Sequence, residues 1–234
     1  MVLGADVSRG AAAALGGMGQ QQQPQQQGDT EAEAEAAAGL EFAAVIGSVD
    51  SHLVDYRQVV SAQVSGNRDV ILGMRDSVAA LLTQYAAAQA AQPKAGAGAR
   101  VGAGAGTASS GPPPVPLPAA VLPEVLLVYR DGVSDSMFDT VLAVEHSAIK
   151  QACRDVGGPG YAPAVTLVVV QKRHNTRLFP ASDKEGQAHR SGNVLPGTLV
   201  DQFVVDGAAF DFFLNSHAGI QGTNKAPRCS VVIH

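Results

Sequence analysis

Two aspartates, Asp6 and Asp131, are the residues whose type and position point most directly to chemistry. Each follows an apolar stretch typical of a β-strand, Val2–Ala5 and Val125–Tyr129. Ligands of α/β sheets bind beyond the carboxyl ends of the strands, so these carboxylates meet at one sheet edge if the strands are neighbours. Carboxylate oxygens suit Mg²⁺ or Mn²⁺, which clamp a phosphate and activate water. The alternative is that Asp131 only opens a turn with Gly132 and that Asp6 is only a cap.

A cationic cluster follows the apolar stretch Val165–Val170, which predicts another covered strand. Its members are Lys172, Arg173, His174, Arg177, Lys184, His189 and Arg190. Such a cluster indicates contacts to the phosphates of a nucleic-acid strand, with salt-dependent affinity and no reading of base sequence. The alternative is a solvated loop with scattered charge.

Ser216 and His217 could suggest a hydrolase dyad, but neighbouring residues on a strand point to opposite faces. We therefore expect a structural hydrogen bond or a strand-end contact for His217 rather than activation of the serine.

The composition limits the other classes of function. The formal net charge is -5 and charged residues make up 16%, so a basic signature exists only locally. The two cysteines, Cys153 and Cys229, form no C-x-x-C motif, which excludes a cysteine-based zinc module and favours a reducing compartment. The N-terminus does not resemble a signal peptide, and no apolar run reaches the ~20 residues that span a bilayer. We expect a soluble chain without a membrane partner.

Two low-complexity segments interrupt the globular sequence. Residues 9–39 are rich in Gln and Glu-Ala repeats, and residues 87–120 are rich in Gly, Ala and Pro. Neither composition can bury a core, so we expect a disordered insertion and a linker insertion.

The remaining segments predict an α/β layered domain, because covered strands alternate with amphipathic helices. Helices are expected over Asp69–Tyr85, with Asn67 or Asp69 as a cap, and after Ser134 or Ser136. The second helix would turn Met137, Val141, Val144, Ala148 and Cys153 inward. Further strands are expected over Glu41–Val49, Gln58–Val64, Val200–Val205, Phe210–Leu214 and Ser230–Ile233.

Seven motifs occur together in a fixed order and carry a family resemblance. They are G-A-D-V-S at Gly4–Ser8, G-S-V-D-S-H at Gly47–His52, Y-R-D-G-V-S at Tyr129–Ser134, Q-K-R-H-N-T-R-L-F at Gln171–Phe179, S-G-N-V-L-P-G-T-L-V-D at Ser191–Asp201, F-D-F-F-L at Phe210–Leu214 and S-H-A-G-I-Q-G-T at Ser216–Thr223. Together they resemble the PIWI domain of eukaryotic Argonaute proteins, over nearly all of residues 1–234 outside the two insertions. The resemblance implies a partial PIWI domain with a ribonuclease-H-like fold, a mixed sheet flanked by helices.

The resemblance also implies a catalytic role for three carboxylates. Slicing members of the family cut an RNA target paired to a small guide RNA, with an Asp-Glu-Asp-His tetrad and two divalent metals. Asp6 and Asp131 match the two metal-binding aspartates, and Asp69 falls on the glutamate position, where its side chain is shorter by a methylene. The histidine of the tetrad lies beyond the matching segment, so we expect cleavage, with its two Mg²⁺ or Mn²⁺ ions, only in a complete form of the domain.

The implied partners are a small guide RNA, its complementary target RNA and proteins of a silencing complex. The expected RNA-binding residues are Lys172, Arg173, Arg177, His217, Gln221 and Thr223. The expected function is small-RNA-guided gene silencing, in the cytoplasm and also in the nucleus. Two alternatives stay open: a non-catalytic RNA-binding fragment, and a truncated gene model without independent function.

Overall fold

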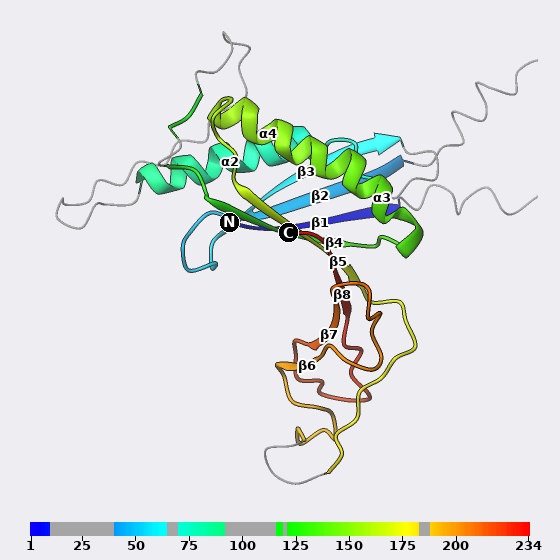
Figure 1. Ribbon diagram of the computed structural model, residues 1–234. Helices are drawn as coiled ribbons and strands as arrows, with labels where there is room; N and C mark the ends of the chain where they lie inside the picture. Colours follow the sequence, from blue (N-terminus) through cyan, green and yellow to red (C-terminus); the bar gives the residue numbers. More distant parts are fainter. Residues whose placement is uncertain (10–39, 65–69, 92–115, 119–120, 183–187) are drawn as a thin grey trace, which may run out of the picture.

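The structure is a computed structural model that describes residues 1–9, 40–64, 70–91, 116–118, 121–182 and 188–234. Its central element in these residues is an eight-stranded sheet with the strand order β3-β2-β1-β4-β5-β8-β7-β6 (Figure 1). The strands are β1 (Val2–Arg9), β2 (Leu40–Ser48), β3 (Tyr56–Val64), β4 (Val125–Asp131), β5 (Ala164–Gln171), β6 (Thr198–Val200), β7 (Asp211–Asn215) and β8 (Arg228–Ile233).

The sheet is mixed, as expected. Its centre is parallel, because β4 pairs in parallel with β1 on one side and with β5 on the other. Strands β2 and β3 extend it in antiparallel fashion at one end, and β8, β7 and β6 do so at the other. The strands that carry Asp6 and Asp131 are therefore neighbours, which confirms the arrangement on which a shared site depends.

Two long helices cover one face of the sheet. Figure 1 shows α2 (Met74–Ala91) and α4 (Ser147–Gly157) side by side over strands β1 to β5. The core lies between these helices and the sheet, and it contains Leu3, Val45, Met74, Val78, Leu81, Leu126, Val141, Ile149, Leu167 and Val169, among others. Packing of these apolar side chains fixes which face of each strand turns toward the helices.

The chain between β4 and α4 is less regular than the expected helix. A 3₁₀ turn, η3 (Asp135–Met137), leads into a single helical turn, α3 (Phe138–Val141), and then into a π-helical turn, η4 (Leu142–His146). The π-turn accommodates one extra residue, so the side chains that follow are rotated relative to a regular helix. Val144 is 42% exposed although it was expected to face inward, whereas Val141 and Cys153 are buried as expected.

Strand β1 and helix α2 also differ from the expected ranges. Strand β1 continues past Ala5 to Arg9, because pairing with β2 extends to Arg9 opposite Glu41. Helix α2 begins at Met74 rather than Asp69 and runs to Ala91, five residues into the expected linker, because alanine has the highest helix propensity.

The expected strand Val200–Val205 is wrong beyond its first residue. Strand β6 ends at Val200, and Phe203 has a φ of 64°, which interrupts an extended backbone.

Several expectations lie outside the described residues. These are the first insertion from residue 10 to 39, nearly all of the second insertion beyond Ala91, and Asn67, Asp69 and Lys184. In the part of the chain that is described, no helix is long and apolar enough to cross a membrane.

Candidate metal and nucleic-acid site

Asp6 and Asp131 lie side by side on the sheet face that the helices leave bare. In the parallel pairing of β1 with β4, Gly4 is opposite Tyr129 and Ala5 is opposite Arg130, so the next step sets Asp6 beside Asp131. Side chains alternate along a strand, and both carboxylates therefore point away from α2 and α4. A Cβ added at Gly132 would lie 3.6 Å from Asp6 Oδ1, which shows how closely Asp6 approaches the backbone after Asp131.

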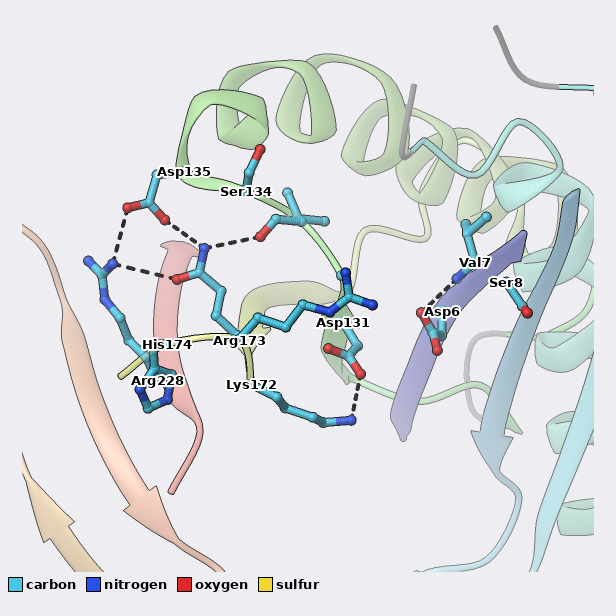
Figure 2. A pocket seen from close by; sticks show the side chains of 13 residues that line it. Asp6, Val7, Ser8, Asp131, Ser134, Asp135, Lys172, Arg173, His174 and Arg228 are labelled. Atoms are coloured by element: carbon cyan, nitrogen blue, oxygen red, sulfur yellow. Dashed lines mark hydrogen bonds and ion pairs between the residues drawn. The ribbon is translucent and has the colours of Figure 1, made fainter. Parts of the chain in front are cut away.

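The two carboxylates open into one cavity of about 930 Å³ (Figure 2). Its lining comes from the ends of β1, β4, β5 and β8 and from the segments that follow β4 and β5. The lining residues are Asp6, Val7, Ser8, Asp131, Gly132, Val133, Ser134, Asp135, Gln171, Lys172, Arg173, His174 and Arg228. Two of the expected RNA-binding residues, Lys172 and Arg173, thus share a cavity with the two expected metal ligands.

Lys172 is the cation nearest to the carboxylates. Its Nζ donates to Asp131 Oδ2 at 2.5 Å, as Figure 2 shows. This hydrogen bond, together with the charges of Asp131 and Asp6, raises the pKa of Lys172 against the opposing effect of desolvation. Because the Lys172 side chain is 64% exposed, such an ion pair contributes only about 0.2–1 kcal/mol and opens readily.

The other wall of the cavity is a polar network that the sequence did not reveal. Asp135 accepts hydrogen bonds from Gln171 Nε2 at 2.6 Å and from Arg228 at 3.1 Å, and its pKa is lowered first by Gln171 and then by Arg228. Arg228 also donates to Asp211, which raises the pKa of the guanidinium.

Two members of this network, Gln171 and Asp135, lie next to elements that the sequence predicted, whereas Arg228 does not. Gln171 directly follows the predicted strand Val165–Val170, and Asp135 follows Asp131 by four residues. Arg228 had no local signal, because it reaches the site only through the antiparallel pairing of β8 with β5, where it lies opposite Gln171.

His174 is packed into the cavity wall rather than presented on it. Its ring meets the edge of Phe213 with the centroids 5.2 Å apart and the planes at 74°. Both ring nitrogens are buried and find no hydrogen-bond partner among the described residues.

The remaining expected RNA-binding residues lie outside this cavity. Arg177 donates from Nη1 to the carbonyls of His174 and Thr176, at 2.9 and 2.7 Å, and so folds back onto its own segment. His217, Gln221 and Thr223 are exposed on the loop after β7.

Buried asparagines hold that loop in place. Asn193 Oδ1 accepts the backbone N–H of Asn224, while Asn224 Nδ2 donates to Asn215 Oδ1 and to the carbonyl of His217. A smaller cavity of about 320 Å³ lies beside the loop, lined by His189, Arg190, Ser191, Ala218, Gly219 and Ile220.

The donor set of the large cavity fits a hard divalent cation. Asp6 and Asp131 supply carboxylate oxygens from adjacent strand ends, and Asp131 already receives a cationic group in Lys172. Within the described residues, no group of three or more His, Cys, Asp or Glu side chains comes together as a metal site. The expected third carboxylate, Asp69, is not among those residues.

Comparison with known proteins identifies the family of this arrangement. A family model of the Piwi domain matches residues 119–234. Protein argonaute 14 of Oryza sativa subsp. japonica is 40% identical over 185 residues, which is 78% of this chain and 17% of that protein. Protein argonaute MEL1 of the same organism is 52% identical over 104 residues, 44% of this chain and 10% of that protein. The chain therefore spans less than a fifth of the length of these relatives.

Solved structures show the same fold. The crystal structure of Kluyveromyces polysporus Argonaute with a guide RNA matches with a TM-score of 0.66 and 21% identity, over 98% of this chain and 22% of that chain. The C-terminal lobe of a budding yeast Argonaute matches with a TM-score of 0.67 and 21% identity, over 100% of this chain and 38% of that chain. The ribonuclease-H-like mixed sheet expected from the motifs is thus confirmed, and the chain belongs to the Piwi domain family as a partial PIWI region of the Argonaute type.

Proposed function

We propose that this chain supplies the metal- and RNA-binding face of an Argonaute-type protein that acts in small-RNA-guided gene silencing. One observation carries the proposal: Asp6 and Asp131, on adjacent parallel strands, open into the same cavity as Lys172 and Arg173. Chemistry on a phosphodiester requires carboxylates that hold a metal ion, and basic side chains beside them that bind the phosphate.

Each side chain has a distinct role in this proposal. Asp6 and Asp131 would hold Mg²⁺ or Mn²⁺, which supplies Lewis-acid stabilisation of a phosphate and activation of water when bound. Lys172 and Arg173 bind backbone phosphates of the RNA and orient the strand across the carboxylates. The exposed loop with His217, Gln221 and Thr223 would extend the RNA-binding surface beyond the cavity.

The wider biology belongs to the same proposal. A guide RNA and its target would be the partners, proteins of a silencing complex would join them, and cleavage would occur in a complete domain. Cys153 and Cys229 are both buried and free, which fits a reducing compartment such as the cytoplasm or the nucleus.

RNA binding without cleavage is the second candidate function. It is favoured by the ion pair between Lys172 and Asp131, because an ammonium group then satisfies the carboxylate in place of a metal ion. The two candidates differ in whether the chain binds a divalent ion at Asp6 and Asp131.

An RNA titration tests the part that both candidates share. Labelled single-stranded RNA is titrated into the 234-residue chain at about 50 mM and about 200 mM salt. Two phosphate contacts, from Lys172 and Arg173, predict a loss of affinity of roughly sevenfold between the two conditions. The double variant Lys172→Gln/Arg173→Gln should bind more weakly, whereas Arg57→Gln on β3 should bind as the wild type does. Absence of binding at low salt would contradict RNA binding.

A Mn²⁺ titration separates the two candidates. Isothermal calorimetry should show binding that Asp6→Asn and Asp131→Asn each weaken, with Asp76→Asn on α2 as the matched control on the opposite side of the sheet. If wild type binds no Mn²⁺ but binds RNA, the non-catalytic function is the correct one.

A further inference from the structure

A buried ion pair lies directly beneath Asp131, on the helix side of the sheet. Arg130 and Glu145 are 1% and 0% exposed, and Arg130 Nε lies 3.0 Å from Glu145 Oε2 and 3.2 Å from Oε1. Burial raises the pKa of Glu145 against the charge of Arg130, which lowers it. Most charged side chains of this size remain at a protein surface, so the location of this pair requires an explanation.

Two local features of the chain bring the pair together. Arg130 points into the core because Asp131, the next residue of β4, points into the cavity. Glu145 points into the core because it lies four residues after the buried Val141 and four before the buried Ile149, on the inward face of this helical stretch, while its neighbour Val144 is exposed. Glu145 lies within the π-turn η4, and turns of this kind occur frequently at functional sites.

The pair is also bonded to the backbone on both sides. Arg130 Nη1 donates to the carbonyl oxygen of Asp131, and Glu145 Oε1 accepts the backbone N–H of Ile71 at 2.8 Å. It thereby joins three segments: the end of β4, the π-turn and the approach to α2. The guanidinium fork allows Arg130 to bind the Glu145 carboxylate and the Asp131 carbonyl at once, which a lysine could not do.

The end of β4 needs such an anchor. The next residue, Gly132, has a φ of 83°, so the chain turns sharply immediately after Asp131. A buried ion pair is a weak source of stability, because hydrophobic side chains of similar volume often replace one at no cost. Placement of a functional group, in contrast, tolerates only about 0.5 Å of displacement.

We propose that Arg130 and Glu145 are positioning residues for the Asp131 carboxylate. By binding the Asp131 carbonyl from the core side, the pair fixes the peptide group from which the carboxylate enters the cavity. This inference rests on the proposed metal site for its effect on binding, although the immobilisation of Asp131 itself does not depend on a metal.

The test uses variants of the full chain that separate positioning from stability. Arg130→Met/Glu145→Gln removes both charges, so that neither is left buried alone, and the amide oxygen introduced by Glu145→Gln can still accept the Ile71 N–H. Arg130→Lys keeps the charge but lacks the fork. The matched control is Arg75→Met/Asp155→Asn, which removes the exposed ion pair between α2 and α4.

Three readouts are measured on each folded variant: the urea midpoint, Mn²⁺ affinity by calorimetry, and backbone ¹⁵N order parameters at Asp131 and Gly132. We expect both Arg130 variants to keep most of the urea midpoint, to bind Mn²⁺ roughly 10-fold or more weakly, and to lose order at Asp131 and Gly132. The control should change none of the site readouts.

If the folded Arg130 variants keep the wild-type order parameters at Asp131 and Gly132, the proposal is overturned, even if their Mn²⁺ affinity falls. A Mn²⁺ loss that only follows the fraction of unfolded chain would overturn it as well, because the pair would then be structural. If the wild type binds no Mn²⁺, the proposed metal site fails, and the order parameters still decide whether the pair immobilises Asp131.

Discussion

At the scale of single residues, the alternation along β4 gives two neighbouring charged side chains opposite tasks. Arg130 is buried against Glu145, and Asp131 faces a cavity that it shares with Asp6. The ion pair between Asp131 and Lys172 then limits metal binding by the Asp131 carboxylate, because the ammonium group and a metal ion compete for the same oxygen.

We therefore predict that Lys172→Met tightens Mn²⁺ binding in the absence of RNA. Removing a partly exposed ion pair worth about 0.2–1 kcal/mol should raise the affinity by up to roughly fivefold. Calorimetry of the variant checks this, with Arg173→Met as the control, because Arg173 lines the same cavity and no ion pair of Arg173 is seen in the described residues. Equal affinities for wild type and Lys172→Met would show that the ammonium does not compete.

At the scale of elements, the irregular stretch between β4 and α4 matters most. Within the π-turn η4, Glu145 is buried and its neighbour Val144 is exposed. The apolar spacing predicted a helix here, but it could not reveal the burial of Glu145, because the partner of this charged side chain is a buried arginine on β4.

Substitution by lysine at two positions tests the register of this turn. Val144→Lys should change the free energy of unfolding by no more than about 0.5 kcal/mol, because the side chain is exposed. Val141→Lys should cost about 3–5 kcal/mol, because it places an unpaired charge in the core. Urea denaturation measures both values, and similar losses for the two variants would contradict the burial of Val141 and the exposure of Val144.

At the scale of the whole molecule, helices α2 and α4 cover one face of strands β1 to β5, and no helix among the described residues lies on the other face. The bare face carries the candidate site at its centre and exposes apolar side chains beside it, namely Phe42, Ile46, Val60, Val64 and Tyr129. Strand pairing makes this surface continuous, since Ile46 lies opposite Gly4 and Gly4 lies opposite Tyr129. Exposed apolar patches promote association, so the isolated chain should have limited solubility.

Val60→Lys tests whether this face drives self-association. Val60 is 59% exposed, so the change should raise the concentration at which light scattering increases and leave the melting temperature nearly unchanged. Gln58→Lys adds the same charge on the same face without removing apolar surface, and it should have the smaller effect. Equal scattering for Val60→Lys and wild type would exclude this face as the cause.

Much of the site was readable in the sequence because its signals are local. The apolar run before Asp131, the cations after β5 and the helical spacing before Tyr85 each involve neighbouring residues, and the ordered motifs indicated the family. Strand β1 is longer than expected because tertiary pairing with β2 extends it up to Arg9.

Only the tertiary structure decided which of these residues meet. Asp6 reaches Asp131 because β1 and β4 pair in parallel across more than a hundred residues of intervening chain, and Arg228 reaches Asp135 through the pairing of β8 with β5. Periodicity reports which face a side chain occupies but not which strand lies beside it. The sequence by itself therefore determined the chemical groups of this PIWI region, while non-local strand pairing assembled them into one cavity and buried the ion pair beneath Asp131.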